Sequence, residues 1–363
     1  MLNWWVSALW STVVSPSRDT GYLTGLRAYA AFAVVAIHTG LGGIGGLGAF
    51  FSNLVNHGKH GVPLFFVLSG YTIALSIYKS DKFSYALYWR RRCSRILPLY
   101  FGLIVFLFLI GYEGSYWAKE LDAPNDFFSL VAHVFFLNVY LSQYSNNIIG
   151  VEWSIPVEFF YYTIIPSMAF LAKKPFGWVL LCVFAYVFSR FGLILPSPFA
   201  DGSEYRYLAW GWQPFRYVWC FVLGVCLASL CTHLDVVKRA FEHSILTVLI
   251  LIVFVVYVYH VHEGSLVFYT LISCGLIITS GRCNKVACFL FENNVALYLG
   301  NISFSLYLLH YPVMKMMYSS AYGNSLTRFA VYIVALFAVA TLSYVFIEYP
   351  FFHRKTKQRA LGL

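Results

Sequence analysis

Long apolar runs follow one another along nearly the whole chain of 363 residues. Runs of about 18 or more apolar residues with few charges are typical of helices that cross a bilayer. Their recurrence predicts an all-α polytopic membrane protein. We predict about ten transmembrane helices, at residues 22–42, 62–79, 96–112, 155–172, 176–195, 208–230, 244–262, 265–281, 297–318 and 327–347.

A further apolar stretch, 127–142, is shorter than the predicted spans. Clusters of Lys and Arg orient the neighbouring spans, because cytoplasmic loops are rich in positive charge. If 79–95 and the pair Lys173 and Lys174 all lie inside, the segment 113–154 begins and ends on the same face of the membrane. We therefore expect 127–142 to be re-entrant or interfacial, with both chain termini cytoplasmic.

The composition agrees with a membrane protein and narrows its partners. The chain is 60% hydrophobic and 11% charged, which excludes an ordinary soluble domain and makes the lipid bilayer its surroundings. The net charge is +10, but the basic residues mark membrane topology, so we expect no nucleic-acid partner. The eight cysteines form no C-x-x-C pair and mostly lie in apolar runs, so we expect no metal site.

Three segments differ in composition. Residues 1–20 hold three tryptophans and no early basic region, which fits an interfacial segment better than a cleaved signal peptide. Residues 21–350 have only short loops and form one membrane domain. Residues 351–363 form a basic tail, which we place in the cytoplasm.

The first predicted span contains two polar residues, Arg27 and His38. Their spacing places them about 16 Å apart along a helix, with the arginine near one membrane face and the histidine near the midplane. Both side chains cost free energy in a bilayer and therefore require a partner or a function. The alternative to a functional role is a structural one, in which the two polar side chains find hydrogen-bond partners inside a helix bundle.

A basic cluster precedes the third span and contains Arg92 and Arg95. In a helix these two residues share a face. Guanidinium groups present several donors that suit phosphate oxygens, so the pair could hold the phosphates of a cofactor such as coenzyme A. The alternative is a topology signal that binds anionic lipid.

The segment from Glu152 to Tyr162 contains a Trp-Ser pair and a carboxylate inside an apolar run. Ser154 is well placed as a helix N-cap, and Glu158 shares its helix face. Because an unpaired carboxylate is costly in a span, Glu158 could orient His38 or pair with Arg27. We expect Glu152 to lie in a solvated loop.

Three further polar positions lie inside or at the end of predicted spans. Ser69 and Gly70 permit a close approach of helices, and no nucleophile motif surrounds Ser69. His310 lies in an apolar run before a proline, and packing does not explain it. Glu348 closes the last span, where we expect it to pair with a cytoplasmic arginine.

Together these segments resemble the acyltransferase-3 family of integral membrane acyltransferases, which includes bacterial polysaccharide O-acetyltransferases. The order and spacing of the blocks make the resemblance specific, and it extends over about residues 20–350. One departure is Pro156, which can move the local helix start where the family often continues with Glu-Gln-Phe-Tyr. The matching blocks are Leu26-Arg27 to His38, Phe65 to Tyr71, Arg92-x-x-Arg95 with Leu97-Pro98, Trp153 to Glu158, and Ser303 to Pro312.

The resemblance implies transfer of an acyl group, usually acetyl, from cytoplasmic acetyl-CoA to a carbohydrate hydroxyl. It makes His38 the main catalytic candidate, with Arg27 and Glu158 beside it, and links Arg92 and Arg95 with the acyl donor. It also implies a multi-pass protein of the bacterial inner membrane, with polysaccharide-assembly proteins as candidate partners. The remaining matching blocks supply our substrate-binding candidates, Trp153, Ser154 and His310.

The mechanism that we expect uses His38 as a general base on the acceptor hydroxyl, or as the first acceptor of the acyl group. Glu158 would orient the imidazole, and Arg27 would stabilise the oxyanion or hold the donor. Two other functional classes remain open, and neither carries out this chemistry. One is a carrier or flippase for acyl groups or lipid-linked sugars, and the other is a structural partner in a polysaccharide-assembly complex.

Overall fold

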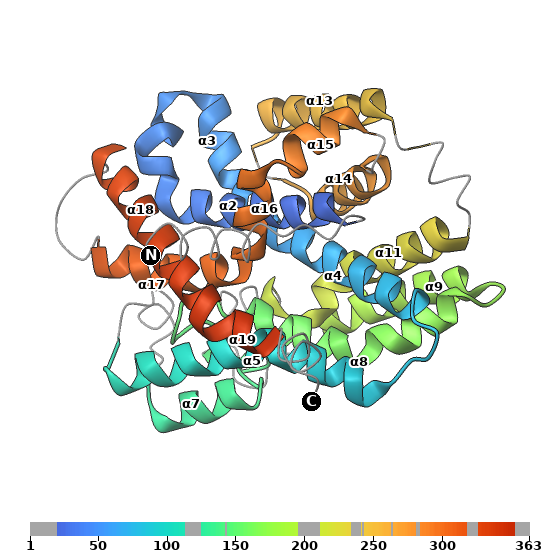
Figure 1. The fold of residues 1–363 in the computed structure, drawn as a ribbon, viewed down its shortest axis with the longest axis horizontal. Helices are drawn as coiled ribbons and strands as arrows, with labels where there is room; N and C mark the ends of the chain where they lie inside the picture. The colour runs from blue at the N-terminus through green and yellow to red at the C-terminus, as the bar shows by residue number, and fades with distance from the viewer. Residues whose placement is uncertain are drawn as a thin grey trace, which may run out of the picture.

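The computed structural model describes residues 20–112, 125–141, 144–194, 211–233, 241, 243–262, 264–280, 284–317 and 326–352, and throughout these ranges every regular element is a helix. The predicted interfacial segment 1–20 and the tail 351–363 lie almost wholly outside them. The elements are α2 (Gly21–Thr39), η1 (Gly40–Leu47), α3 (Ala49–Asn56), η2 (His57–His60), α4 (Gly61–Tyr78), α5 (Tyr85–Leu109), α7 (Phe127–Val134), α8 (Ser154–Ala172), α9 (Gly177–Ile194), α11 (Pro214–His233), α13 (Ser244–His260), α14 (Leu266–Thr279), α15 (Lys285–Phe291), α16 (Asn294–Asn301), α17 (Ser303–Met317), α18 (Leu326–Ser343), η4 (Tyr344–Glu348) and α19 (Tyr349–Phe352) (Figure 1).

Several of these helices are long and apolar enough to cross a membrane, which supports a multi-pass protein. Among the described residues there are five such candidates by length and composition. Three further apolar helices are shorter, so the predicted number of about ten spans stays a prediction. The five candidates are Ala49–Tyr78, Tyr85–Leu109, Ser154–Ala172, Pro214–His233 and Leu326–Phe351.

One predicted span, 297–318, and the shorter stretch 127–142, which we did not predict to be a span, can be compared with the observed helices. The stretch 297–318 is divided between α16 and α17, with a break at Ile302. The stretch 127–142 contains only the eight-residue α7, far short of the ~20 residues that a spanning helix needs. This confirms that 127–142 is not a simple span.

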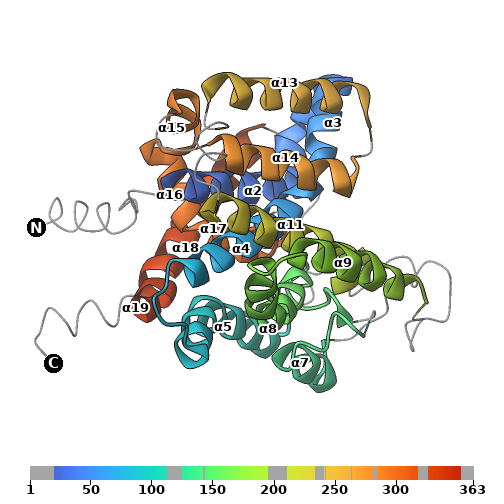
Figure 2. The same cartoon turned by 90° about the vertical axis from the view of Figure 1, so that its right-hand side faces the viewer.

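The helices α4 and α11 lie side by side at the centre of the bundle (Figures 1 and 2). Glycines at the contact allow their backbones to approach closely. A Cβ atom added to Gly70 would lie 2.6 Å from the carbonyl oxygen of Phe221, and one added to Gly224 would lie 2.4 Å from that of Val67. The expected role of Gly70 in close helix packing is therefore confirmed.

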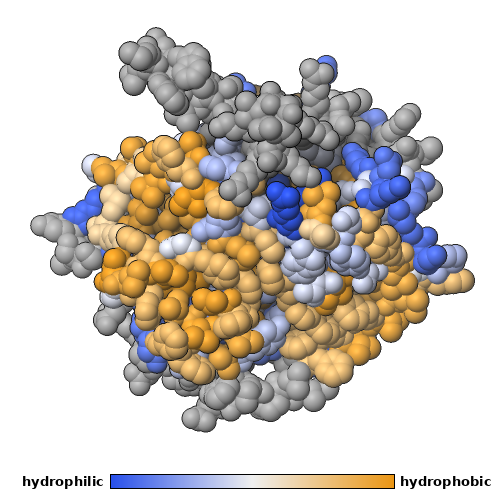
Figure 3. All heavy atoms as spheres, turned by 60° about the horizontal axis from the view of Figure 1, so that its bottom comes forward, coloured by the Kyte–Doolittle hydropathy of each residue, from blue (hydrophilic) through white to orange (hydrophobic). Residues whose placement is uncertain are grey.

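Large apolar side chains remain exposed on the outer helices. On the face shown in Figure 3, hydrophobic residues form a broad area that hydrophilic patches interrupt. Helix α13 alone exposes Ile245, Leu249, Ile252 and Val256. Such surfaces are unfavourable in water and are normal on helices that face lipid. The polar residues of interest lie inward, where α2 packs against α4, α16 and α17.

Candidate active site

Two cavities lie next to each other inside the bundle and share Val62 and Tyr307 in their walls. The first, here called the arginine cavity, has a volume of about 50 Å³ and is lined by Arg27, Ser69, Arg95, Ser154, Glu158, Tyr162 and apolar neighbours. The second, here called the histidine cavity, has a volume of about 390 Å³ and is lined by His38, Lys59, His60, Asn146, Trp153, Trp212, Arg216 and Tyr217 among others.

Helix α8 places Glu158 in the arginine cavity. Its carboxylate accepts a hydrogen bond from the hydroxyl of Ser69 on α4 and another from Tyr162, at 2.7 Å. Arg27 lines the same cavity from α2 and donates through Nη2 to the hydroxyl of Thr72 at 3.3 Å. The structure thus brings Arg27 and Glu158 together, although hydroxyl groups rather than each other are their hydrogen-bond partners in the described chain.

The two arginines of the basic cluster have different positions relative to this cavity. Both lie inside α5, which begins at Tyr85 and so includes the whole cluster in one helix. Arg95 lines the cavity directly. The guanidinium of Arg92 lies over the rings of Tyr88 and Tyr162, 5.8 and 5.7 Å from their centres. Arg92 is thus not among the residues that line the cavity, but it contacts the ring of Tyr162, which is one of them.

His38 lies in the last turn of α2, where its exposed side chain lines the histidine cavity. Its Nδ1 lies 2.9 Å from the carbonyl oxygen of Val34 and 3.2 Å from Nε2 of His310. The Nδ1 of His310 lies 2.6 Å from the carbonyl oxygen of Tyr307, so this nitrogen donates and the Nε2 of His310 accepts. These acceptors favour a proton on Nδ1 of His38 and leave its Nε2 as the basic atom.

The expected contact between Glu158 and His38 is absent from the described structure, and this expectation was wrong. The two residues line different cavities, and the partner of the His38 ring is His310. The sequence places His310 near the other end of the chain, so no local spacing could reveal this pair. The pairing accounts for the polar residue in α17 that packing did not explain.

The pair Trp153 and Ser154 stands between the two cavities. Trp153 lines the histidine cavity and Ser154 lines the arginine cavity. The predicted N-cap role of Ser154 was wrong, because α8 begins at Ser154 itself and Trp153 is the N-cap residue. Instead, Ser154 donates to the hydroxyl of Tyr307 at 2.7 Å, and Tyr307 donates to the carbonyl oxygen of Val151 at 2.6 Å.

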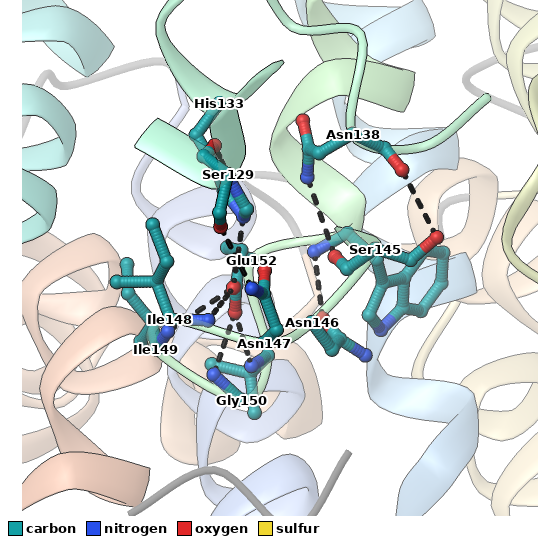
Figure 4. A network of polar contacts seen from close by, with 12 residues as sticks. Ser129, His133, Asn138, Ser145, Asn146, Asn147, Ile148, Ile149, Gly150 and Glu152 are labelled. Atoms are coloured by element: carbon teal, nitrogen blue, oxygen red, sulfur yellow. Dashed lines mark hydrogen bonds and ion pairs between the residues drawn. The ribbon is translucent and has the colours of Figure 1, made fainter. Parts of the chain in front are cut away.

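Sequence reasoning missed Glu152, which is fully buried rather than solvated. Its Oε1 accepts from the backbone N–H groups of Ile148 and Ile149 at 2.9 and 3.0 Å. Its Oε2 accepts from those of Gly150 and Val151 at 2.6 and 2.9 Å. Figure 4 shows how the loop folds around this carboxylate.

A buried histidine completes the environment of Glu152. The Nε2 of His133 lies 3.1 Å from Oε1 of Glu152, and its Nδ1 lies 2.8 Å from the carbonyl oxygen of Ser129 (Figure 4). The same loop carries Asn146, whose side chain accepts from the backbone N–H of Trp153 at 3.0 Å. The Glu152 network therefore fixes the loop that forms one wall of the histidine cavity.

The last predicted site concerns Glu348 in η4. Its residue is 2% exposed, and its carboxylate accepts a hydrogen bond from the hydroxyl of Ser305, whose oxygen also lies 3.0 Å from the hydroxyl of Ser343. A hydroxyl rather than an arginine is thus its direct hydrogen-bond partner in the described chain. No group of three or more His, Cys, Asp or Glu residues in the described ranges could hold a metal ion.

Comparisons with known proteins identify the family of the chain. A family model for an acyltransferase domain, acyltransferase-3, matches residues 20–348. The chain belongs to the acyltransferase-3 family. It is similar to the O-acetyltransferase OatA of Staphylococcus aureus strain NCTC 8325 / PS 47, with 24% identity over 90% of this chain and 56% of the relative. It is 25% identical to SACOL0978 of S. aureus strain COL, over 94% of this chain and 58% of that protein.

The chain spans a little over half the length of these curated relatives. No solved structure matches it. The family match covers every residue that lines the two cavities, from Arg27 to Tyr307, and also His310.

Proposed function

We propose that this protein is a membrane O-acyltransferase that moves an acetyl group from cytoplasmic acetyl-CoA to a hydroxyl of a cell-surface polysaccharide or its lipid-linked precursor. The observation that carries the proposal is the pair of adjacent cavities, one with two arginines and a glutamate, the other with a basic histidine nitrogen. The similarity to OatA, which is named an O-acetyltransferase, supports oxygen as the acceptor atom.

The arginine cavity suits the reacting end of the donor. Its volume of about 50 Å³ corresponds to one or two water molecules, so it favours an acyl group as small as acetyl over a long chain. Arg95, with Arg92 against the ring of Tyr162, carries the charge that the phosphates of coenzyme A require. Arg27 supplies a donor for the oxyanion that forms at the thioester carbonyl.

The histidine cavity suits the acceptor. Its volume of about 390 Å³ lies within the ~300–1,000 Å³ of ordinary small-molecule sites. Nε2 of His38 takes the proton of the acceptor hydroxyl while the hydroxyl oxygen forms a bond to the thioester carbon. The carbon–sulfur bond then breaks, and the proton passes to the departing coenzyme A thiolate. His310 holds the ring of His38 in the required tautomer.

The same lone pair could first accept the acetyl group itself. In either route the acyl group passes the shared wall of Val62 and Tyr307, so this wall has to open between the cavities. The proposal places the protein in a bacterial inner membrane with both termini cytoplasmic, where proteins of polysaccharide assembly would supply the acceptor.

The test measures the O-acetyl content of purified surface glycan in a deletion strain that carries wild-type protein or His38→Ala, with both proteins quantified in membranes. We expect a loss of at least about 100-fold in acetyl ester, the usual contribution of a general base. His260→Ala, an exposed histidine at the end of α13, is the matched control. Full acetylation with His38→Ala would refute the assignment, and altered glycan transport with normal acetylation would favour a carrier.

A further inference from the structure

Two hydroxyl groups of α4 bind two of the charges that line the arginine cavity. Ser69 donates to Oε1 of Glu158, and Oγ1 of Thr72 accepts from Nη2 of Arg27 at 3.3 Å. Ser69 and Thr72 are three residues apart in α4, so they share one face of the helix. This face therefore binds a carboxylate from α8 and a guanidinium from α2.

Packing fixes the part of α4 that carries these hydroxyls. Gly70, next to Ser69, lies so close to α11 that an added Cβ atom would be 2.6 Å from the carbonyl oxygen of Phe221. The hydroxyl of Thr72 donates to the carbonyl oxygen of Leu68 at 2.7 Å, so it meets the guanidinium as an acceptor. The two hydroxyls are therefore held at set positions in the bundle.

A second hydroxyl fixes the same oxygen of Glu158. Tyr162 donates to Oε1 at 2.7 Å, and Oε1 is also the oxygen that Ser69 binds. Tyr162 is itself buried, and its carbonyl oxygen accepts from the hydroxyl of Tyr88 at 2.7 Å. Among the described residues, no donor to Oε2 of Glu158 is found, so Oε2 is the oxygen that remains for a ligand.

Arg27 and Glu158 attract each other, although they do not form an ion pair within the described ranges. Their charges interact across the cavity that both of them line. A direct contact between guanidinium and carboxylate would be stronger than the contact of either group with a neutral hydroxyl. The structure instead has each charge on a hydroxyl of α4. An arrangement that gives up a favourable contact is expected at a functional site.

We propose that Ser69 and Thr72 are positioning residues that hold Glu158 and Arg27 apart and so keep the arginine cavity open. The separation leaves Oε2 of Glu158 and the other N–H groups of Arg27 for the acyl donor. Without either hydroxyl, the released side chain moves to the opposite charge, and the ion pair fills the space that the donor needs. This inference deepens the proposed function and rests on it for the identity of the ligand, whereas the separation is a property of the protein alone.

The first test measures the transfer of labelled acetyl groups from acetyl-CoA to surface glycan, per amount of folded full-length protein in lipid nanodiscs. Ser69→Ala and Thr72→Val each remove one hydroxyl with little change in shape. We expect each to lower acetyl transfer about tenfold, because each removes a hydrogen bond to a charged group. The loss should fall on kcat more than on the KM for acetyl-CoA, since Arg92 and Arg95 are unchanged. Ser69→Thr and Thr72→Ser keep a hydroxyl and should recover most of the activity.

The double variant Ser69→Ala/Thr72→Val separates this role from a general loss of packing. Because the loss of either hydroxyl is enough to let the pair close, the double variant should lose about as much activity as one single variant. Independent packing defects would multiply to about a hundredfold loss, which would overturn the inference. The control is Ser76→Ala, because Ser76 lies on the exposed side of α4 and its hydroxyl donates to the carbonyl oxygen of Ile73.

Infrared difference spectroscopy reports the surroundings of Glu158 without turnover. The difference between wild type and Glu158→Gln isolates the antisymmetric and symmetric stretches of this carboxylate. We expect Ser69→Ala and Thr72→Val to shift both bands, as a direct contact with Arg27 forms, and Ser76→Ala to leave them in place. Unchanged bands in the Ser69 and Thr72 variants would overturn the inference.

The two readouts separate this inference from the proposed function. Shifted bands in both variants, without acetyl transfer by the wild type, would support the positioning role and refute acyl transfer. Acetyl transfer by the wild type, with unchanged bands in both variants, would do the reverse.

Discussion

Two glutamates of one sequence motif, Glu152 and Glu158, have opposite environments. Glu152 is fully buried and receives four backbone N–H groups and the ring of His133. Glu158 is partly buried, receives hydroxyl groups from Ser69 and Tyr162, and faces a cavity that contains two arginines. The first carboxylate organises the backbone around it, and the second stands among side chains beside open space.

The difference separates a structural carboxylate from a reactive one. Backbone N–H groups are fixed by the fold, and a carboxylate that binds four of them loses its freedom to exchange partners. Hydroxyl groups can rotate and can donate elsewhere when a substrate enters. We therefore expect Glu152 to govern the folded state and Glu158 to govern the reaction.

The largest expected effect is that of Glu152→Ala, which tests whether this carboxylate is needed for the folded state. The substitution leaves four backbone N–H groups and His133 without their acceptor in a buried site. Each unsatisfied group costs about 1–3 kcal/mol, so the total is comparable to the stability of a typical domain. We expect little folded protein in membranes, as measured by fluorescence-detected size-exclusion chromatography.

Glu152→Gln serves as the companion variant, because it keeps one acceptor oxygen of the same shape and should recover part of the folded protein. A wild-type yield from Glu152→Ala would show that the loop does not depend on this carboxylate.

The second largest effect should follow from Glu158→Gln, and it should fall on activity instead. The amide can keep a contact with Ser69 or Tyr162, but it removes the negative charge beside Arg27 and Arg95. We expect acetyl transfer to fall by at least about tenfold with a normal amount of folded protein, since charged contacts are about twice as strong as neutral ones. An equal loss of folded protein and activity would erase the distinction between the two glutamates.

From the sequence, the membrane character of the protein and the candidate residues could be predicted better than the contacts between these residues. Arg27, Glu158 and His38 stood out because a polar group in an apolar run is costly, and Arg95 stood out because it shares a helix face with Arg92. All four line the two cavities. The contact of His38 with His310 joins helices from opposite ends of the chain, and helical spacing contains no information about such contacts.

Glu152 was misjudged for a related reason. A carboxylate between helices normally faces water, and its burial depends on how the loop folds back upon it. Gly150 allows this fold, since its φ of +104° is unfavourable for other residues and a Cβ atom there would lie 2.5 Å from the ring of Tyr311. The number of spans was harder to predict because several apolar helices are short or interrupted, and hydropathy alone does not place such breaks.

The smallest predicted effect concerns Tyr307, which contacts both the arginine cavity of Glu158 and the loop around Glu152. The hydroxyl of Tyr307 accepts from Ser154 beside the arginine cavity and donates to Val151 in the loop of Glu152. Tyr307→Phe removes both contacts and keeps the ring in the wall of both cavities. We expect a stability loss of about 2 kcal/mol, because each of the two hydrogen bonds contributes about 1 kcal/mol net.

The same variant should reduce acetyl transfer only a few-fold, with a larger change in kcat than in KM, because the ring still separates donor from acceptor while its position becomes less defined. The melting temperature in detergent measures the loss of stability, and steady-state kinetics with purified acceptor glycan measure the loss of activity. The control is Tyr298→Phe, because Tyr298 lies outside both cavity linings and its hydroxyl pairs with that of Thr341 at 2.5 Å. A loss of folded protein as large as that of Glu152→Ala would place Tyr307 with the scaffold of the loop. A loss of activity as large as that of Glu158→Gln, with normal stability, would show that the Tyr307 hydroxyl takes part in the reaction and does not only separate the two cavities.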